Sequence, residues 1–177
     1  RSSVYETVAR NILREEFGEI VPNHEAGETY VGTLDSWDED GLVLDAGPAG
    51  DVRIRAQNLD LGQGSPAQIR KRFGLVQHLS LRFVAGPEPR LADEEVDRLY
   101  DWKRGGDHDN GRVNTNSATR SEVRATVNKS GHAQDIVTVE RLGLLEMSII
   151  CNPDTDAPGL LADIGRFMPS ELLAVVP

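Results

Sequence analysis

The sequence has little cysteine, few aromatic residues and no long apolar run. Cys151 is the single cysteine among 177 residues, so an internal disulfide framework is excluded, and this usage is typical of a reducing cytosol. No apolar run approaches the roughly 18 to 20 residues of a transmembrane helix, and no secretory signal opens the sequence. We therefore expect a cytoplasmic protein with no membrane partner.

Motifs of the common enzyme classes are also missing. There is no phosphate loop of the G-x-x-x-x-G-K type, no nucleophile elbow and no paired-cysteine zinc site. Asp154 and Asp156 are two short carboxylates without the further ligands that Mg²⁺ requires. The histidines are scattered without metal-ligand spacing, at His24, His78, His108 and His132. We expect a non-enzymatic protein with no catalytic residues, no metal and no cofactor.

Lysine is scarce, with 3 Lys against 16 Arg, whereas Asp and Glu total 29 and the formal net charge is −10. This composition resembles that of cytosolic proteins from salt-loving archaea, in which carboxylates keep the surface hydrated. The resemblance implies an archaeal, halophilic origin. At 1 M salt the Debye length is about 3 Å, so an acidic net charge is only weak evidence against a nucleic-acid partner.

Basic residues are concentrated in residues 51–84. This segment holds six basic and two acidic side chains, whereas the residues before and after it are net acidic. The basic residues are Arg53, Arg55, Arg70, Lys71, Arg72 and Arg82. They either contact the phosphates of a nucleic acid or pair with the surface carboxylates of an acidic protein. Because only two acids lie within the segment, we favour the first interpretation.

The residues before this segment predict a helix and then a small barrel. Apolar residues recur every four positions from 4 to 17, which indicates a helix, and we expect residues 1–22 to be the remnant of a missing N-terminal domain. Strands are predicted at 30–34, 42–45, 52–56 and 79–84, with a hairpin turn at Asp40-Gly41 and a short helix at 67–73. Residues 23–88 therefore predict a five-stranded OB-type barrel.

The run YVGTLDSWDEDGLVLDAG, followed by DVRIRAQNL and SLRFV, resembles the S1 class of RNA-binding OB domains. The resemblance implies RNA binding across the outward face of the sheet, where Arg53 and Arg55 alternate with apolar neighbours. The second and third predicted strands carry no aromatic side chain for base stacking. Trp37, on the first hairpin, is either a stacking residue or a plug for the end of the barrel.

The remainder predicts a linker and a second domain. A helix at 91–102, with Asp93 as a possible N-cap, and a Gly-rich loop make residues 89–111 the linker. Residues 112–177 then alternate as βαββαβ, with helices that begin near Thr119 and Asp156, which is the order of a ferredoxin-like sandwich. The predicted fold class is α+β, a small S1/OB-like β-barrel followed by a ferredoxin-like βαββαβ sandwich.

Two helix starts in the second domain are candidate ligand sites. Asn116, Thr119 and Arg120 precede and open a helix whose free N–H groups favour an anion. The stretch NPDTDAPGLL resembles the strand-to-helix turn of ACT regulatory domains, which implies an amino-acid pocket at Asp156 and Gly159. Ordinary helix capping also explains both sets of residues, and it is the interpretation that we favour.

The stretches NSATRSEV, VERLGLLE and TDAPGLLADIG resemble an archaeal family of conserved proteins without an assigned function. This resemblance runs over nearly the whole chain and implies no particular site residues. Our leading hypothesis is a non-enzymatic RNA-binding or ribonucleoprotein-associated factor of the ribosome or the transcription machinery, with a protein partner on the ferredoxin-like sheet. The alternatives are an amino-acid sensor built on the second domain and a protein-interaction scaffold.

Overall fold

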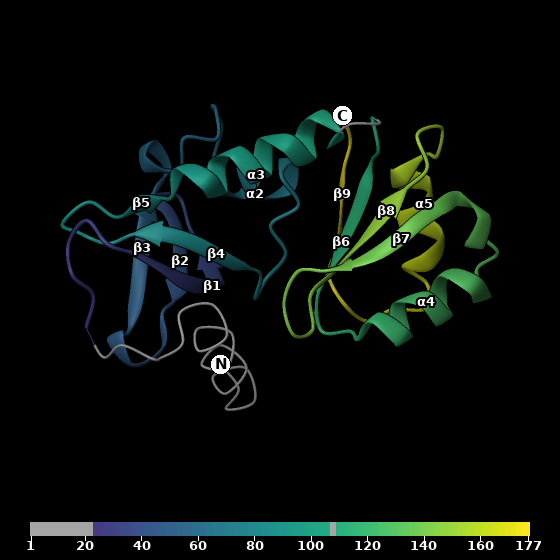
Figure 1. Cartoon of the computed structure of the whole chain (residues 1–177), viewed down its shortest axis with the longest axis horizontal. Coiled ribbons are helices and arrows are strands. Elements are labelled where there is room, and N and C mark those ends of the chain that lie inside the picture. The colour runs from purple at the N-terminus through teal and green to yellow at the C-terminus, as the bar shows by residue number, and fades with distance from the viewer. Residues whose placement is uncertain (1–22, 107–108) are drawn as a thin grey trace. The chain divides into compact units, whose positions relative to one another are not determined.

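The computed structural model describes residues 23–106 and 109–177, which divide into two compact units (Figure 1). The first unit comprises residues 23–69 and 77–98, and the second comprises residues 70–76 and 99–177. Both contain strands and helices, so the α+β class is confirmed. The helix predicted at residues 4–17 lies outside the described residues. The second unit takes in residues 70–76, and residues 89–111 are divided between the two units. The domain bounds expected from the sequence stay predictions.

The first unit is a curled, five-stranded antiparallel half-barrel. Its strands lie in the order β3-β2-β1-β4-β5. Their bounds are Thr29–Trp37 for β1, Gly41–Asp45 for β2, Asp51–Arg55 for β3, Ser80–Val84 for β4 and Arg90–Leu91 for β5. The edge strands β3 and β5 approach each other, which curls the sheet around its core.

The first hairpin shows how the local sequence builds this sheet. Asp38 Oδ1 accepts hydrogen bonds from the backbone N–H groups of Asp40 and Gly41, which fixes the turn between β1 and β2. A Cβ at Gly41 would lie 2.0 Å from the carbonyl oxygen of Ile54, so only glycine allows β2 to pair with β3 there. Ile54, on β3, is completely buried, as its alternation with Arg53 and Arg55 predicts, and its partner on β2, Leu42, is completely buried as well.

Helix α2 (Pro66–Arg72) lies between β3 and β4 in the chain, and α3 (Asp93–Arg104) follows β5. Ser65 Oγ accepts the backbone N–H of Gln68, whose side chain in turn accepts the N–H of Ser65, so α2 begins with a reciprocal cap. Leu91, predicted as the first residue of a helix, instead pairs with Phe83 in the sheet and is buried. Burial of this side chain against β4 outweighs its helix propensity, and α3 begins two residues later.

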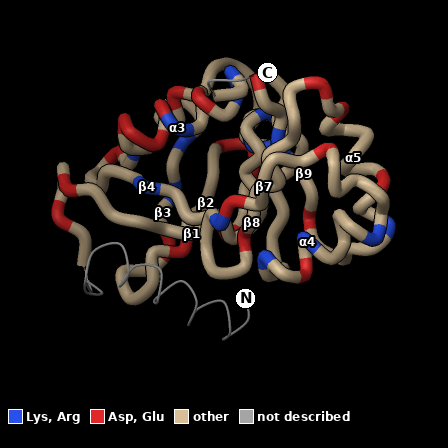
Figure 2. Tube along the Cα trace, turned by 45° about the vertical axis from the view of Figure 1, so that its right-hand side comes forward, with Lys and Arg blue, Asp and Glu red and all other residues tan. Residues whose placement is uncertain are grey.

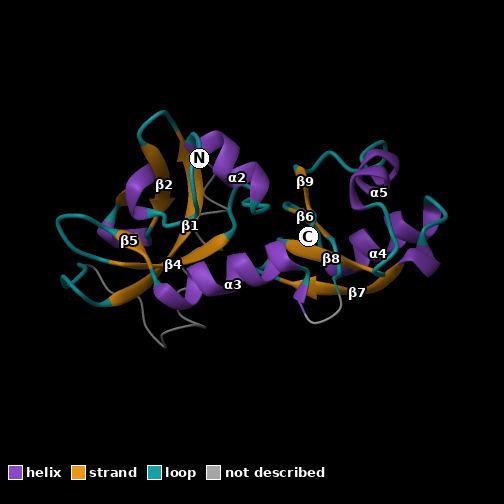
Figure 3. Ribbon diagram, turned by 90° about the horizontal axis from the view of Figure 1, so that it is seen from above, coloured by secondary structure: helices purple, strands orange, loops and turns teal. Residues whose placement is uncertain are grey.

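The second unit is a four-stranded antiparallel sheet of order β7-β8-β6-β9. The elements are β6 (Arg112–Thr115), α4 (Arg120–Lys129), β7 (Ile136–Arg141), β8 (Met147–Cys151), α5 (Ala157–Ile164) and β9 (Leu172–Val175). Helices α4 and α5 cover one face of this sheet (Figure 3). Their buried Val123, Val127, Leu160 and Ile164 pack on strand residues that include Ile149, which forms the core.

The ends of the second unit's helices test the predicted caps. Thr119 and Glu122 form a reciprocal capping box, which confirms the helix start predicted near Thr119. Gly131 follows α4 with φ +80°, as expected for a residue just past a helix end. Asp156 lies at the N-cap position of α5, but its side chain makes no capping hydrogen bond.

Candidate nucleic-acid interface and neighbouring sites

Arg53 and Arg55 project outward from β3, because the residues that alternate with them, Val52 and Ile54, turn toward the core. Arg53 Nη1 donates to both carboxylate oxygens of Asp38, at 2.7 and 2.6 Å. Arg55 Nη1 donates to Glu88 Oε1 at 3.3 Å. All four charged side chains are about half exposed, from 45% for Asp38 to 60% for Glu88. Both arginines are therefore paired, but in pairs that water and ions reach.

The Asp38–Arg53 pair holds both groups in their charged forms. The hydrogen bond from Arg53, followed by that from the Asp40 backbone, lowers the pKa of Asp38 below its ordinary value. The same contact raises the pKa of Arg53. Because the pair is exposed, solvent screens its attraction and it contributes little to stability. The guanidinium group is thus oriented by Asp38 without being buried by it.

The six basic residues predicted as one nucleic-acid surface do not share one strand or one unit. Arg53, Arg55 and Arg82 belong to the first unit, and Arg70, Lys71 and Arg72 to the second. Acidic residues are spread among them along both units (Figure 2). Arg82 is half-buried on β4, and its backbone N–H donates to Glu95 Oε2 at 2.7 Å. Only Arg53 and Arg55 are brought side by side on an exposed strand.

Arg70 has a structural position. Its side chain is 3% exposed, its Nε donates to the carbonyl oxygen of Leu75 at 3.2 Å, and its Nη2 donates to Glu171 Oε1. A guanidinium group this buried contacts a phosphate only if it first breaks its hydrogen bonds to Leu75 and Glu171. Lys71, the next residue, is exposed, and Arg72 is partly buried.

Trp37 is the last residue of β1, where it pairs with Leu42 of β2 and is partly buried. Its intermediate exposure suits the plug and the stacking interpretation equally, and both stay predictions.

A small pocket of about 280 Å³ borders β3 in the first unit. Its lining residues are mostly apolar: His24, Ala26, Val52, Phe83, Ala85, Gly86, Pro87 and Pro89. The His24 ring packs against Tyr30, with ring centroids 4.3 Å apart, and against Phe83 at 5.4 Å. Burial lowers the pKa of His24, so this ring is neutral at pH 7. No local sequence pattern indicates this pocket, because its walls come from three separate segments of the chain.

In the second unit, the sheet face opposite α4 and α5 is lined by polar side chains that bond within the unit. Asn114 is completely buried, and its Nδ2 donates to the carbonyl oxygen of Gly74 at 2.9 Å. Ser148 Oγ donates to Asn114 Oδ1 at 2.6 Å. The Arg112 guanidinium stacks over the Trp102 ring at 4.6 Å. Residues of the chain itself therefore occupy the centre of the face on which we expected a protein partner.

The predicted ligand residues lie at opposite ends of this sheet. Because β6 and β8 are antiparallel, the helix that follows β6 and the helix that follows β8 begin at opposite ends of these strands. Asn116 is 5% exposed, and its Oδ1 accepts the backbone N–H of Glu171 at 3.0 Å. Thr119 is engaged in its capping box, and Arg120 is exposed. The structure thus does not bring these residues together with Asp156 and Gly159.

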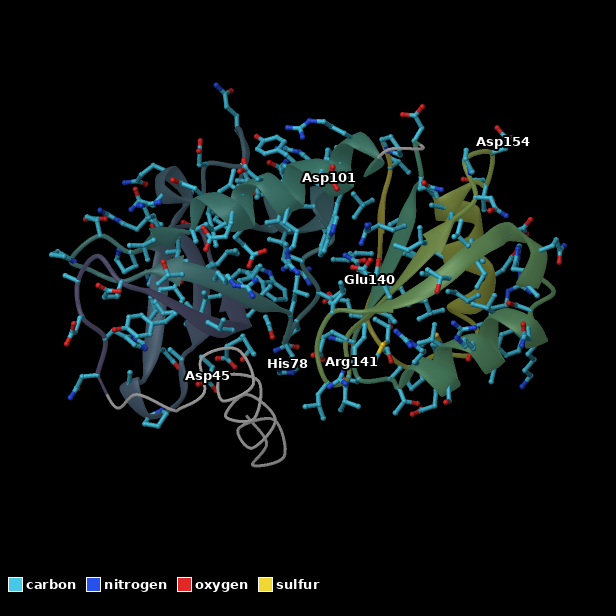
Figure 4. The ribbon with its side chains drawn as sticks, viewed as in Figure 1. Asp45, His78, Asp101, Glu140, Arg141 and Asp154 are labelled. Atoms are coloured by element: carbon cyan, nitrogen blue, oxygen red, sulfur yellow. The ribbon has the colours of Figure 1, made fainter. Side chains whose placement is uncertain are left out.

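Asp156 and Gly159 line an open groove of about 640 Å³ in front of α5. Carboxylates dominate its rim, at Asp135, Asp154, Asp156 and Asp163, and Figure 4 shows Asp154 in the loop that precedes α5. Its histidine, His132, has Nδ1 2.8 Å from Asp135 and Nε2 2.7 Å from Asp163. These carboxylates raise the pKa of His132. The lining is better suited to a cationic group than to an anion.

Neither a metal cluster nor a membrane span is found within residues 23–106 and 109–177. No three His, Cys, Asp or Glu side chains in these ranges are arranged to hold a metal ion. No helix in the same ranges combines the length and the apolar character needed to cross a bilayer. Cys151 is buried in the core, where desolvation raises the pKa of its thiol to about 11.

Comparison with known proteins gives a family. Residues 24–103 match the DUF2110 central domain, and residues 110–176 match the DUF2110 C-terminal domain. The two matched ranges together take in most of the 177 residues. No curated protein and no solved structure matches the chain.

Proposed function

The chain belongs to the DUF2110 family, which brings no assigned activity with it, and we propose on physical grounds that it is a non-enzymatic RNA-binding or ribonucleoprotein-associated factor. Arg53 and Arg55 of β3 are the proposed phosphate contacts. The observation that carries the proposal is their arrangement: two guanidinium groups project from one strand, and each is paired with a solvent-exposed carboxylate.

The strand arrangement supports this choice. Around the half-barrel the strands follow one another as β1-β2-β3-β5-β4, and a helix precedes β4, which is the connectivity we propose to be of the OB type. OB folds bind nucleic acid across the outward faces of their second and third strands, and β3 is such a strand here. For the second unit we propose a ferredoxin-like sandwich, on its βαββαβ order and its sheet order.

The spacing of the two arginines suits a single strand. Residues two apart on a β-strand point to the same side and lie about 6.6 Å apart. This separation is comparable to that of neighbouring phosphates in an extended nucleic-acid backbone. A phosphate that displaces Asp38 from Arg53 replaces one charge-assisted hydrogen bond by another, so the exchange costs little. The nearby carboxylates repel the phosphate, so we expect the RNA to bind weakly and in a salt-dependent manner.

The salt dependence tests the proposal quantitatively. Two phosphates on a single strand predict a slope of about −1.4 for log K against log salt concentration, because each contributes about −0.7. The assay is fluorescence anisotropy with a labelled 20-nucleotide uridine RNA between 50 and 300 mM salt (about the range in which such slopes are resolved). The variant Arg53→Glu with Arg55→Glu should abolish both the binding and the slope.

A matched control separates contact from net charge. Arg124 and Arg166 are exposed arginines of the second unit, so Arg124→Glu with Arg166→Glu makes the same charge change away from β3. We expect this control to bind RNA nearly as the native chain does. Equal losses in the two double variants, or no loss in either, would overturn the assignment to β3.

We also propose the setting implied by composition, the cytoplasm of a salt-loving archaeon. Support comes from the excess of carboxylates and the replacement of Lys by Arg. The test is the urea midpoint of unfolding in low and in molar KCl, which should rise strongly with salt because screening relieves the repulsion within a chain of net charge −10.

A further inference from the structure

The small pocket beside β3 shares two chain segments with the arginine pair and its carboxylates. Val52, in its wall, directly precedes Arg53 on the strand. Pro87 and Pro89, also in its wall, flank Glu88, the carboxylate that accepts from Arg55. Because neighbouring side chains on a strand point to opposite sides, Val52 and Arg53 face opposite sides of β3. The pocket and the charged rim therefore meet at the β4–β5 connection, where Glu88 lies between two prolines of the wall.

A second polar group fixes this rim. Asn58 Nδ2 donates to Glu88 Oε2 at 3.0 Å, while Arg55 donates to the other oxygen of the same carboxylate. Both hydrogen bonds are exposed to solvent, so a ligand can take over either of them. An amide and a guanidinium offer donors to the exocyclic oxygens of a ring and to a phosphate.

The walls of the pocket select a flat and largely uncharged group. His24 is neutral through burial, and the proline rings present flat apolar faces. Phe83 forms the floor and is completely buried, so it closes the pocket and leaves the ring contacts to His24 and the prolines. A volume of about 280 Å³ lies at the lower end for small-molecule pockets, roughly 300 to 1,000 Å³, which suits one ring system.

We propose that this pocket accepts one nucleobase of a single-stranded RNA whose adjoining phosphates contact Arg53 and Arg55. The inference rests on the proposed function and adds a base contact to it. It also supplies the stacking surface that β2 and β3 lack, because the ring contacts come from His24, ahead of β1 in the chain, and from the prolines of the β4–β5 connection. A nucleotide uses both features. A ring without an attached anion would not contact the arginines, and a free phosphate would not fill the apolar pocket.

The test compares two oligonucleotides of equal length and charge, a uridine RNA and the same strand with abasic sugars. Stacking of one base predicts that the intact RNA binds at least about fivefold more tightly than the abasic one. Ala26→Trp, at an exposed position in the wall, should fill the pocket and reduce this ratio to one without weakening the abasic strand. Ala67→Trp, at an exposed position on α2, is the control and should keep the ratio.

The outcomes separate the two proposals. If both strands bind equally and Ala26→Trp changes nothing, the pocket is refuted while phosphate binding stands. If neither strand binds, the proposed function and this inference both fail. A third measurement does not depend on a folded variant: photocrosslinking with a 4-thiouridine RNA should label the tryptic peptide of residues 83–90, and crosslinks found only elsewhere would overturn the pocket.

Discussion

Replacement of Arg70 by methionine should destabilise the second unit rather than weaken RNA binding. The side chain is 3% exposed and bonds to Glu171 and to the carbonyl oxygen of Leu75, so its loss leaves both acceptors without this donor. Breaking a buried ion pair costs about 3–5 kcal/mol. Because Glu171 is 31% exposed, water recovers part of its solvation, and we expect about 3 kcal/mol.

Tryptophan fluorescence during urea unfolding measures this free energy for the second unit alone. The chain has two tryptophans, and Trp37→Phe leaves Trp102, which is buried in the second unit, as the reporter. With a urea slope of about 2 kcal/mol per molar, a loss of 3 kcal/mol lowers the midpoint by about 1.5 M. The exposed neighbour provides the control, since Lys71→Met should shift the free energy of unfolding by no more than about 0.5 kcal/mol.

A double variant tests the cause of the loss. Arg70→Met combined with Glu171→Met removes the unpaired carboxylate, and we expect it to recover most of the lost stability, because apolar replacement of a whole buried pair is often neutral. If Arg70→Met alone leaves the midpoint unchanged, or if the double variant is as unstable as the sum of the single ones, the structural role of this pair is refuted.

Three further predictions concern the second unit. Asp135 and Asp163 raise the pKa of His132, so the stability that protonated His132 contributes is complete below about pH 6.5 and is lost as pH rises through the folded-state pKa. His132→Asn should therefore lower the free energy of unfolding by about 1 kcal/mol in acid and leave it unchanged in base. Parallel curves of unfolding free energy against pH for the native chain and the variant would contradict this. Gly74→Ala should cost about 3 kcal/mol in urea unfolding, because φ is +69° and its Cβ would lie 2.5 Å from a Val175 methyl group; native stability in this variant would refute the packing. Cys151, with a thiol pKa of about 11 and no exposed surface, should react with a thiol reagent at pH 8 only as fast as the protein unfolds, and rapid labelling of the native chain would show an accessible thiol.

Local patterns predicted the elements well, since each depends on neighbours in the chain. The alternation of apolar and basic residues on β3 correctly predicted that Arg53 and Arg55 point outward. The helix predicted to begin near Thr119 is α4, which begins there. The sequence resemblance to a conserved family without an assigned function is confirmed. Leu91 is the instructive exception, because its pairing with β4 depends on a strand that the local pattern does not contain.

Ion pairing could not be predicted from the charge count. The segment 51–84 holds only two acids, but the partners of its arginines come from outside it, at Asp38, Glu88 and Glu171. Strand pairing and packing decide which carboxylates lie beside these arginines. Glu171, for example, lies 101 residues from Arg70 in the chain. A local excess of positive charge therefore does not establish a free cationic surface.

The central claim is that Asp38 and Glu88 hold two arginines that RNA can take over. The variant Asp38→Asn with Glu88→Gln keeps both hydrogen-bond acceptors but removes their charges, so it tests this claim most directly. Its affinity for the 20-nucleotide uridine RNA, measured at one fixed low salt concentration, should exceed that of the native chain severalfold, because neither arginine is then held by a competing negative charge. Unchanged or weaker binding would contradict the account.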